Sequence, residues 1–168
     1  MPDTVMTAPV RIIGIGSATG VDALGRAAIE RLRKSRWAAH HPAGLVDIAA
    51  CPAPALLPAR VRGPGLLVLI DALPDDGAPG RVRQLSVEEL ASAPETSSHG
   101  MGIREAVALI EALEGDALKT IVLGISCGAS DDVADIDALL DAAWPALPEI
   151  LDGLIAPLPA TARESLVN

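Results

Sequence analysis

Aromatic side chains are almost missing from this chain. It has no Phe and no Tyr, and its two Trp residues are Trp37 and Trp144. The hydrophobic fraction is nevertheless 50%, so the core must be built from Leu, Ile, Val and Ala. A length of 168 residues can bury a core of useful size, and we expect residues 1–168 to form a single domain.

Basic residues are also scarce relative to acidic ones. The chain has 13 Lys and Arg against 22 Asp and Glu, a formal net charge of −9. This balance argues against nucleic acids and anionic membranes as partners, because both attract basic surfaces. The chain has no run of about 18 apolar residues, so no membrane span is predicted. The start MPDTVMTAPV lacks the basic and apolar regions of a secretory signal, so we expect a cytoplasmic protein.

Cysteine is nearly absent too. Cys51 and Cys127 are the only two, and without an export signal they are expected as free thiols. Neither has a His beside it in sequence to activate it as a nucleophile. The chain also lacks the G-x-S-x-G elbow of many serine hydrolases. Small buried or loop thiols are therefore the simpler interpretation.

What the chain does contain is an alternation of apolar runs and amphipathic segments. We expect strands over Val10–Ile15, Leu45–Ala50, Leu66–Ile70 and Thr120–Ile125, and an edge strand, possibly antiparallel, over Arg81–Leu85. Helices are expected over Asp22–Lys34, Ala53–Arg60, Val87–Leu90, Gly102–Leu113 and, interrupted by prolines, Asp131–Ile155. This alternation predicts a three-layer α/β/α fold with a mixed, mainly parallel five-stranded sheet.

The first strand leads into a glycine-rich turn, G-x-G-x-x-x-G over 14–20, followed by Asp22. A dinucleotide site is one interpretation of such a turn. However, Asp22 stands at a helix start, where it would repel a pyrophosphate. If the second and third strands flank the first, Asp22 and Asp71 meet at the switch point of the sheet. Two acids there suit a cation better than an anion.

A third candidate ligand is His99, which follows two serines in a polar loop. Two carboxylates and an imidazole suit a divalent ion such as nickel or zinc. The simpler alternatives are an Asp22 that caps the first helix and a His99 that is merely exposed. Spacing alone leaves these alternatives open.

Three segments, GIGS…DALG, LLVLIDAL and SSHGMGIREAVALIEAL, resemble the hydrogenase maturation proteases. The segment ALLDAAWPALPEILDGL is similar to the Pro-containing last helix of that family, so the resemblance covers roughly Arg11–Leu154. It implies a phosphorylase/hydrolase-like fold and an aspartic-type endopeptidase. That enzyme would remove the C-terminal extension of a nickel–iron hydrogenase large-subunit precursor after nickel insertion.

Carried over residue by residue, the resemblance places Asp22, Asp71 and His99 on the metal ligands. The nickel would be borne by the substrate, with zinc or cadmium as substitutes in crystals. Asp47, in the segment of the family's Asp-Gly-Gly turn, becomes a candidate for a supporting catalytic role. The implied partner is the hydrogenase precursor, and we expect a monomer.

The chain also departs from the family pattern. Ser17 replaces the usual Asn, Val21 stands where an extra Asp is common, and Asp22 replaces Glu. These departures indicate a divergent member. They keep open a non-catalytic assembly protein of the same fold and, as a more distant alternative, a nucleotide-binding domain.

Overall fold

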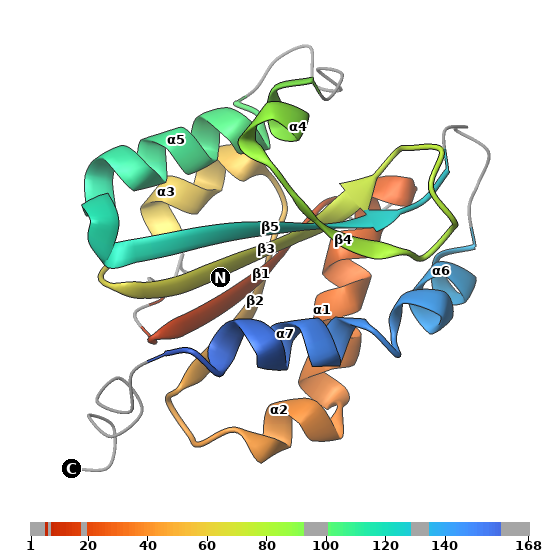
Figure 1. The fold of residues 1–168 in the computed structure, drawn as a ribbon, viewed down its shortest axis with the longest axis horizontal. Helices are drawn as coiled ribbons and strands as arrows, with labels where there is room; N and C mark the ends of the chain where they lie inside the picture. Colours follow the sequence, from red (N-terminus) through yellow and green to blue (C-terminus); the bar gives the residue numbers. More distant parts are fainter. Residues whose placement is uncertain (1–5, 7, 18–19, 93–100, 129–134, 159–168) are drawn as a thin grey trace.

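The structure is a computed structural model that describes residues 6, 8–17, 20–92, 101–128 and 135–158. Its strands are β1 (Val10–Ile15), β2 (Val46–Cys51), β3 (Gly65–Leu73), β4 (Val82–Leu85) and β5 (Leu118–Ser126). Its α-helices are α1 (Leu24–Lys34), α2 (Arg36–His40), α3 (Leu57–Arg60), α4 (Val87–Ser92), α5 (Ile103–Glu114), α6 (Ile136–Ala143) and α7 (Leu147–Ile155) (Figure 1). Short 3₁₀ turns precede α1 (Val21–Ala23), α3 (Pro54–Leu56) and β5 (Gly115–Ala117).

The sheet has the strand order β2-β1-β3-β5-β4. β1 pairs in parallel with both β2 and β3, and β3 pairs in parallel with β5. The short β4 pairs antiparallel with β5 at the edge of the sheet. The predicted mixed, mainly parallel sheet is therefore confirmed, including β4 as the antiparallel edge strand.

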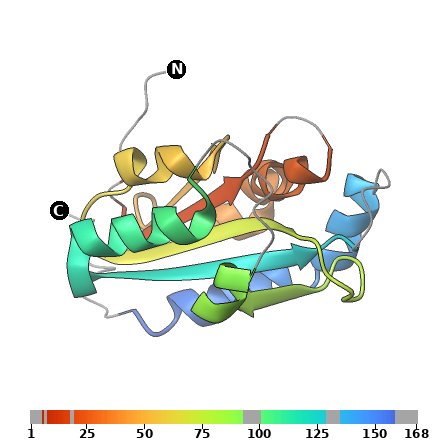
Figure 2. The same cartoon turned by 90° about the horizontal axis from the view of Figure 1, so that it is seen from above.

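Helices cover both faces of the sheet. In Figure 1, α3 and α5 lie on one side of the strands, and α1, α2, α6 and α7 lie on the other. Figure 2 shows the strands side by side between these layers. Each face has its own apolar core, because side chains in a strand alternate between faces: Ile12, Val68 and Leu123 belong to one core, and Ile13, Leu69 and Val122 to the other.

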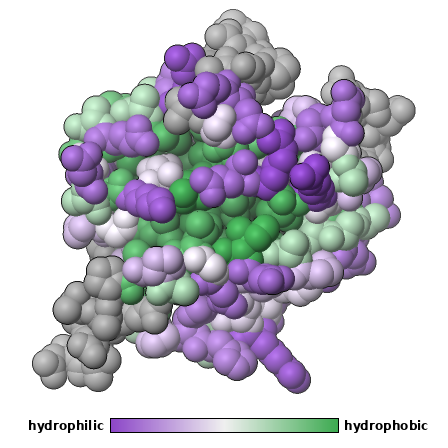
Figure 3. All heavy atoms as spheres, viewed as in Figure 1, coloured by the Kyte–Doolittle hydropathy of each residue, from purple (hydrophilic) through white to green (hydrophobic). Residues whose placement is uncertain are grey.

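Aliphatic side chains form both cores, as the composition predicts. None of the fully buried hydrophobic residues that the structure describes is aromatic. In the view of Figure 3, apolar side chains gather at the centre of the molecule between α5 and α7, and polar side chains surround them. None of the described helices has both the length and the apolar character needed to cross a bilayer.

One strand end differs from the sequence-based expectation. β3 continues to Leu73 instead of ending before Asp71, because β5 runs beside it as far as Ser126 and supplies pairing partners. The last helical region is divided into α6 and α7 by a turn at 144–146, so the expected interruption by proline is confirmed. Pro145, within that turn, cannot continue the helical hydrogen bonding. Residues 131–134 of the expected helix lie outside the described residues.

A buried arginine lies at the amino-terminal ends of the parallel strands. Arg11 in β1 is fully buried, and its guanidinium donates hydrogen bonds to the carbonyl oxygens of Arg62, Gly63 and Pro64. Burial lowers the pKa of Arg11, and the negative charges of Glu114 and Asp47 oppose this effect. Arg11 therefore fixes the loop that leads into β3. It lies away from the carboxyl ends of the strands.

Candidate functional site

The candidate site lies at the carboxyl ends of β1 and β3. The parallel pairing of these strands ends at Gly14 and Ile70, whereas β3 continues beside β5. β1 connects through α1 to β2 on one side, and β3 lies on its other side. This is the switch point of the sheet, where the ends of neighbouring strands diverge and leave a crevice.

Glycines bring the start of α1 close to this crevice. A Cβ atom at Gly25 would lie 2.2 Å from the carbonyl oxygen of Ile15 and 2.5 Å from that of Ile70. A Cβ at Gly14 would lie 2.1 Å from the carbonyl oxygen of Gly25. Gly16 has a φ of 140°, and a Cβ there would lie 1.6 Å from the carbonyl oxygen of Asp22. Only glycine allows such close backbone approach at these positions.

Asp22 lies in the 3₁₀ turn between β1 and α1 and its side chain is exposed. The turn is closed by a backbone hydrogen bond from Ala23 to Gly20, 3.0 Å long. Ala23, and not Asp22, occupies the N-cap position of α1, and no side chain caps that helix. The interpretation of Asp22 as the cap of α1 is therefore wrong, and its carboxylate is left for another role.

Asp71 is partly buried in β3, one residue beyond the last pair of β1 with β3. Its Oδ1 accepts a hydrogen bond from the backbone N–H of Ala72 at 2.8 Å. Burial raises the pKa of Asp71 to about 7; the Ala72 hydrogen bond opposes this shift, and the charge of Asp22 adds to it. The structure thus brings Asp22 and Asp71 within electrostatic reach of one another, as the predicted strand order requires.

The structure does not bring Asp47 to this arrangement, and it does not describe His99. His99 lies outside the described residues, so its role as third ligand stays a prediction. Asp47 lies in β2 opposite Arg11 of β1, four positions before the carboxyl end of the strand. At about 3.3 Å per residue, this separates it by roughly 13 Å along the sheet from the level of Ile15 and Cys51. The position of Asp47 beside Arg11 favours a structural role.

We call Asp22, Asp71, Asp75 and Cys127 together the acidic edge. Asp75 and Cys127 are the two members not yet described. Cys127 follows β5, and its backbone N–H donates to the carbonyl oxygen of Leu73 at 3.0 Å. Burial raises the pKa of this thiol first, and the charges of Asp75, Asp71 and Asp22 raise it further. Cys51 and Cys127 are both free, as predicted. They lie at opposite sides of the sheet, on β2 and after β5.

The sequence did not single out Asp75, because it lies in a turn-rich loop where acidic residues are common. In the structure Asp75 accepts a hydrogen bond from the backbone N–H of Gly77 at 3.1 Å and pairs with Arg83 at 3.4 Å. Arg83 comes from β4, so this pair ties the loop after β3 to the edge strand. Asp75 helps to shape the rim and adds negative charge to it.

The chemistry of the edge suits a cation. Burial and, to a smaller extent, the charge of Asp22 disfavour the charged form of Asp71, and a cation beside the two carboxylates would favour it. Among the residues that the structure describes, no group of three or more His, Cys, Asp or Glu side chains is arranged to hold a metal ion. The described part of the edge supplies two carboxylate donors, and further donors must come from elsewhere.

Comparison with solved structures identifies the class of fold. A [NiFe] hydrogenase maturation protease, HycI from Thermococcus kodakarensis KOD1, aligns with a TM-score of 0.60 at 21% identity, over 89% of this chain and 93% of that chain. The endopeptidase HycI from Escherichia coli aligns with a TM-score of 0.55 at 19% identity, over 86% and 90% of the two chains. The hydrogenase maturating endopeptidase HybD from E. coli aligns with a TM-score of 0.55 at 18% identity, over 86% and 93%.

The chain therefore has the fold of the hydrogenase maturation proteases, and the resemblance seen in the sequence is confirmed at the level of the fold. No protein-family model matches the sequence, and no curated protein matches it either. At identities of 18–21%, shared structure is visible where sequence similarity is weak.

Proposed function

We propose that this protein is a divergent hydrogenase maturation endopeptidase. It would remove the C-terminal extension of a nickel–iron hydrogenase large-subunit precursor once nickel has been inserted. The observation that carries the proposal is that Asp71, just beyond the pairing of β3 with β1, lies close enough to Asp22 to be affected by its charge, in a fold shared with HycI and HybD.

In this proposal the nickel belongs to the substrate. Asp22 and Asp71 would supply two oxygen donors to it, and His99 would supply a nitrogen donor from the loop before α5. Carboxylate and imidazole are suitable ligands for nickel among the divalent ions. Occupation of the crevice by a filled metal centre would place the adjoining extension of the precursor beside these side chains. An unfilled precursor would leave the two carboxylates to repel one another.

The residues of the acidic edge also limit the chemistry. Cys127 is buried, and its raised pKa keeps the thiol protonated near neutral pH, which makes it a poor nucleophile. No Ser or Cys nucleophile is needed if a water molecule attacks the peptide bond. Asp71, with a pKa of about 7, can hold or release a proton at neutral pH. This gives Asp71 a possible part in proton transfer besides its part in metal recognition.

Processing of a precursor tests the proposal directly. The protein would be mixed with a nickel-loaded large-subunit precursor encoded near it, and the precursor's mass would be followed. We expect cleavage by the wild type and loss of cleavage in Asp22→Asn, Asp71→Asn and His99→Ala. Asp116→Asn is a matched control, because Asp116 is exposed at the other end of the sheet, in the turn before β5.

A non-catalytic assembly protein of the same fold is the second candidate. The departures at Ser17 and Val21, beside the Asp22 turn, favour it. It predicts that the wild type binds the precursor in a pull-down without shortening it. Equal cleavage by the wild type and Asp71→Asn would contradict the role proposed for the acidic edge. The nucleotide-binding alternative is disfavoured, because Asp22 and Asp71 would repel a phosphate at this crevice. A cytoplasmic location remains part of the proposal.

A further inference from the structure

The two edges of the sheet differ in their protection against pairing with another strand. β2 lies at one edge and β4 at the other, and an edge strand presents backbone groups to which a further strand can bind. β4 has only four residues and carries Arg83. β2 has six residues, is apolar except for Asp47, and contains neither Lys nor Pro. The part of the chain that the structure describes places no strand on the outer side of β2.

The backbone groups of β2 alternate between its inner and its outer side. The carbonyl oxygen of Cys51 accepts from the backbone N–H of Gly16 at 3.1 Å, and that of Leu45 accepts from Val10 at 3.0 Å. Val10 begins β1 and Gly16 follows it, so the odd-numbered residues of this segment direct their backbone groups to β1. The even-numbered residues of β2 therefore direct their N–H and C=O groups outward. These residues are Val46, Ile48 and Ala50.

Two arginines bind carbonyl groups on this outer side. The Nε of Arg33 in α1 donates to the carbonyl oxygen of Ile48 at 2.9 Å. The guanidinium of Arg60 in α3 donates to the carbonyl oxygen of Ala50 at 3.0 Å. Because α1 and α3 pack against opposite faces of the sheet, one arginine reaches the edge from each face. A strand added to β2 would have to displace both of these charge-assisted hydrogen bonds.

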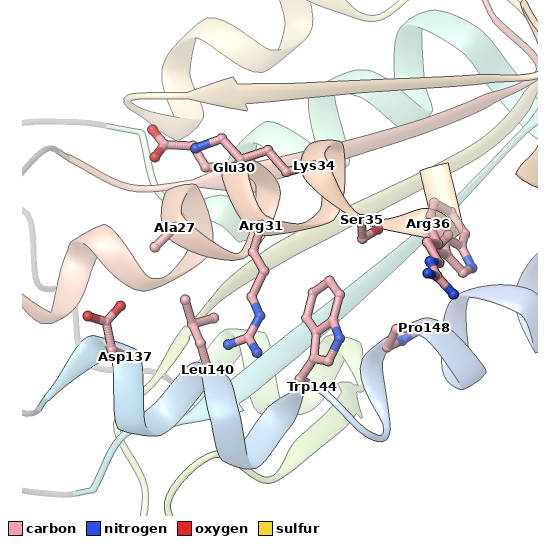
Figure 4. A pocket seen from close by; sticks show the side chains of 11 residues that line it. Ala27, Glu30, Arg31, Lys34, Ser35, Arg36, Asp137, Leu140, Trp144 and Pro148 are labelled. Carbon is pink, nitrogen blue, oxygen red and sulfur yellow. The ribbon is translucent and has the colours of Figure 1, made fainter. Parts of the chain in front are cut away.

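Arg33 differs in this respect from its neighbours on α1. Arg31 and Lys34 line an open groove between α1–α2 and α6–α7, which both tryptophans of the chain also line (Figure 4). Arg31 pairs there with Asp141 at 2.6 Å. Arg33 does not line the groove, and its exposed side chain turns to the carbonyl of β2 instead. Its position on α1 thus serves the sheet edge and not the contact of α1 with α6.

We propose that Arg33 and Arg60 hold the outer edge of β2 closed against pairing with β2 of a second copy of this chain. Two arginine caps replace the shortness and the charge that protect β4. The device keeps copies of the protein apart, and it does not depend on the proteolytic activity proposed above.

The sequence of β2 identifies a second copy as the strand that the arginines exclude. In an antiparallel two-fold pairing centred on Ile48, that residue lies opposite its own copy and Val46 lies opposite Ala50. All three outward-facing residues are then paired, and each apolar side chain meets an apolar one. Asp47, the one charged residue of β2, lies opposite Ala49, so no like charges meet.

Sedimentation velocity over a range of concentrations tests the role of the arginines. The decisive variant is Arg33→Met/Arg60→Met, which removes both donors. Its matched control, Arg36→Met/Arg104→Met, removes the same charge from exposed residues of α2 and α5. We expect the decisive variant to dimerise with a Kd at least about tenfold below that of the wild type, because dimerisation no longer breaks four charge-assisted hydrogen bonds. The control should remain monomeric like the wild type.

A second pair of variants tests the pairing of the strands. In the Arg33→Met/Arg60→Met background, Ala49→Asp brings a carboxylate opposite Asp47 of the other copy, whereas Ala49→Lys brings an ammonium group there. We expect Ala49→Asp to weaken the dimer at least about tenfold relative to Ala49→Lys. Circular dichroism should show all variants folded. If the double arginine variant does not fold, Arg33→Met alone takes its place, because the Arg33 side chain is exposed.

Four results would overturn the proposal. A wild type that dimerises as tightly as the arginine variant would show that the edge is not closed. An arginine variant that stays monomeric over the same concentrations would show that other groups keep the copies apart. Equal dimerisation by the control would reduce the effect to net charge. Equal dimerisation by Ala49→Asp and Ala49→Lys would place the contact elsewhere on the molecule.

Discussion

Replacing Asp71 by Asn should remove a large part of the pH dependence of stability. In the folded protein the pKa of Asp71 is raised to about 7, chiefly because burial disfavours its charged form. In the unfolded chain it should return to an ordinary value of about 3.9. The folded state therefore holds a proton that the unfolded state has already lost between about pH 4 and pH 7.

The sign follows from proton linkage. A carboxyl with a raised folded pKa stabilises the protein fully below its unfolded pKa, and this stability is lost as the pH rises through the folded pKa. The slope approaches about −1.4 kcal/mol per pH unit in the middle of that window and is halved at the folded pKa, so Asp71 should cost about 2 kcal/mol between pH 5 and pH 7. Above about pH 7 the loss levels off. Asn is uncharged at every pH and keeps an oxygen that can accept from Ala72.

Urea unfolding followed by tryptophan fluorescence measures this effect. The free energy of unfolding of the wild type minus that of Asp71→Asn should fall by about 2 kcal/mol from pH 5 to pH 7. Taking this difference cancels the titration of groups that do not interact with Asp71. Asp116→Asn should follow the wild type. If the wild type and Asp71→Asn give parallel curves, Asp71 ionises normally and the partly desolvated crevice is not as described.

Three further outcomes follow from particular contacts. Arg11→Leu should lower the free energy of unfolding by roughly 3–5 kcal/mol in the same assay, because three carbonyl oxygens lose the buried guanidinium that donates to them. A loss below about 1 kcal/mol would contradict this. Gly25→Ala should destabilise the protein by more than about 2 kcal/mol, because the added Cβ would collide with two carbonyl oxygens. The same change should weaken cadmium binding measured by calorimetry. Tight, unaltered cadmium binding would refute the role of this contact. In the native protein, Cys51 and Cys127 should react with iodoacetamide at pH 8 at least about tenfold more slowly than in urea, because both thiols are buried and the pKa of Cys127 is raised. Mass spectrometry of the labelled protein checks this. Rapid labelling of either residue in the native protein would contradict it.

The sheet could be predicted largely from the sequence. β1 and β3 are continuous apolar runs, which are typical of strands buried on both faces, and β4 alternates as an edge strand does. The sequence analysis took β2 and β3 to flank β1 as a condition, and the observed strand order meets it. Helix ends were less accurate, since the start of α1 depends on the 3₁₀ turn that closes over Gly16. That turn is a tertiary contact, which local propensity does not encode.

The candidate site, like the fold, could be predicted only in part from the sequence. Acidic residues after the first strand and at the end of the third were visible in the sequence, as was a possible meeting of Asp22 and Asp71 at the switch point. The desolvation of Asp71 was not, because it depends on how far β5 extends beside β3 and on how closely α1 packs against the strand ends. The placement of Asp47 beside Arg11 also required the register between β1 and β2.

Composition and periodicity by themselves determined the fold class, an aliphatic core, two free thiols and the acids available at the sheet edge. Only the tertiary structure decided that Asp22 and Asp71 interact, that Asp22 does not cap α1, and that both tryptophans line one groove. The physical reason is that strand and helix patterns depend on neighbours along the chain. Electrostatic shifts and grooves depend on backbone approaches between segments far apart in sequence.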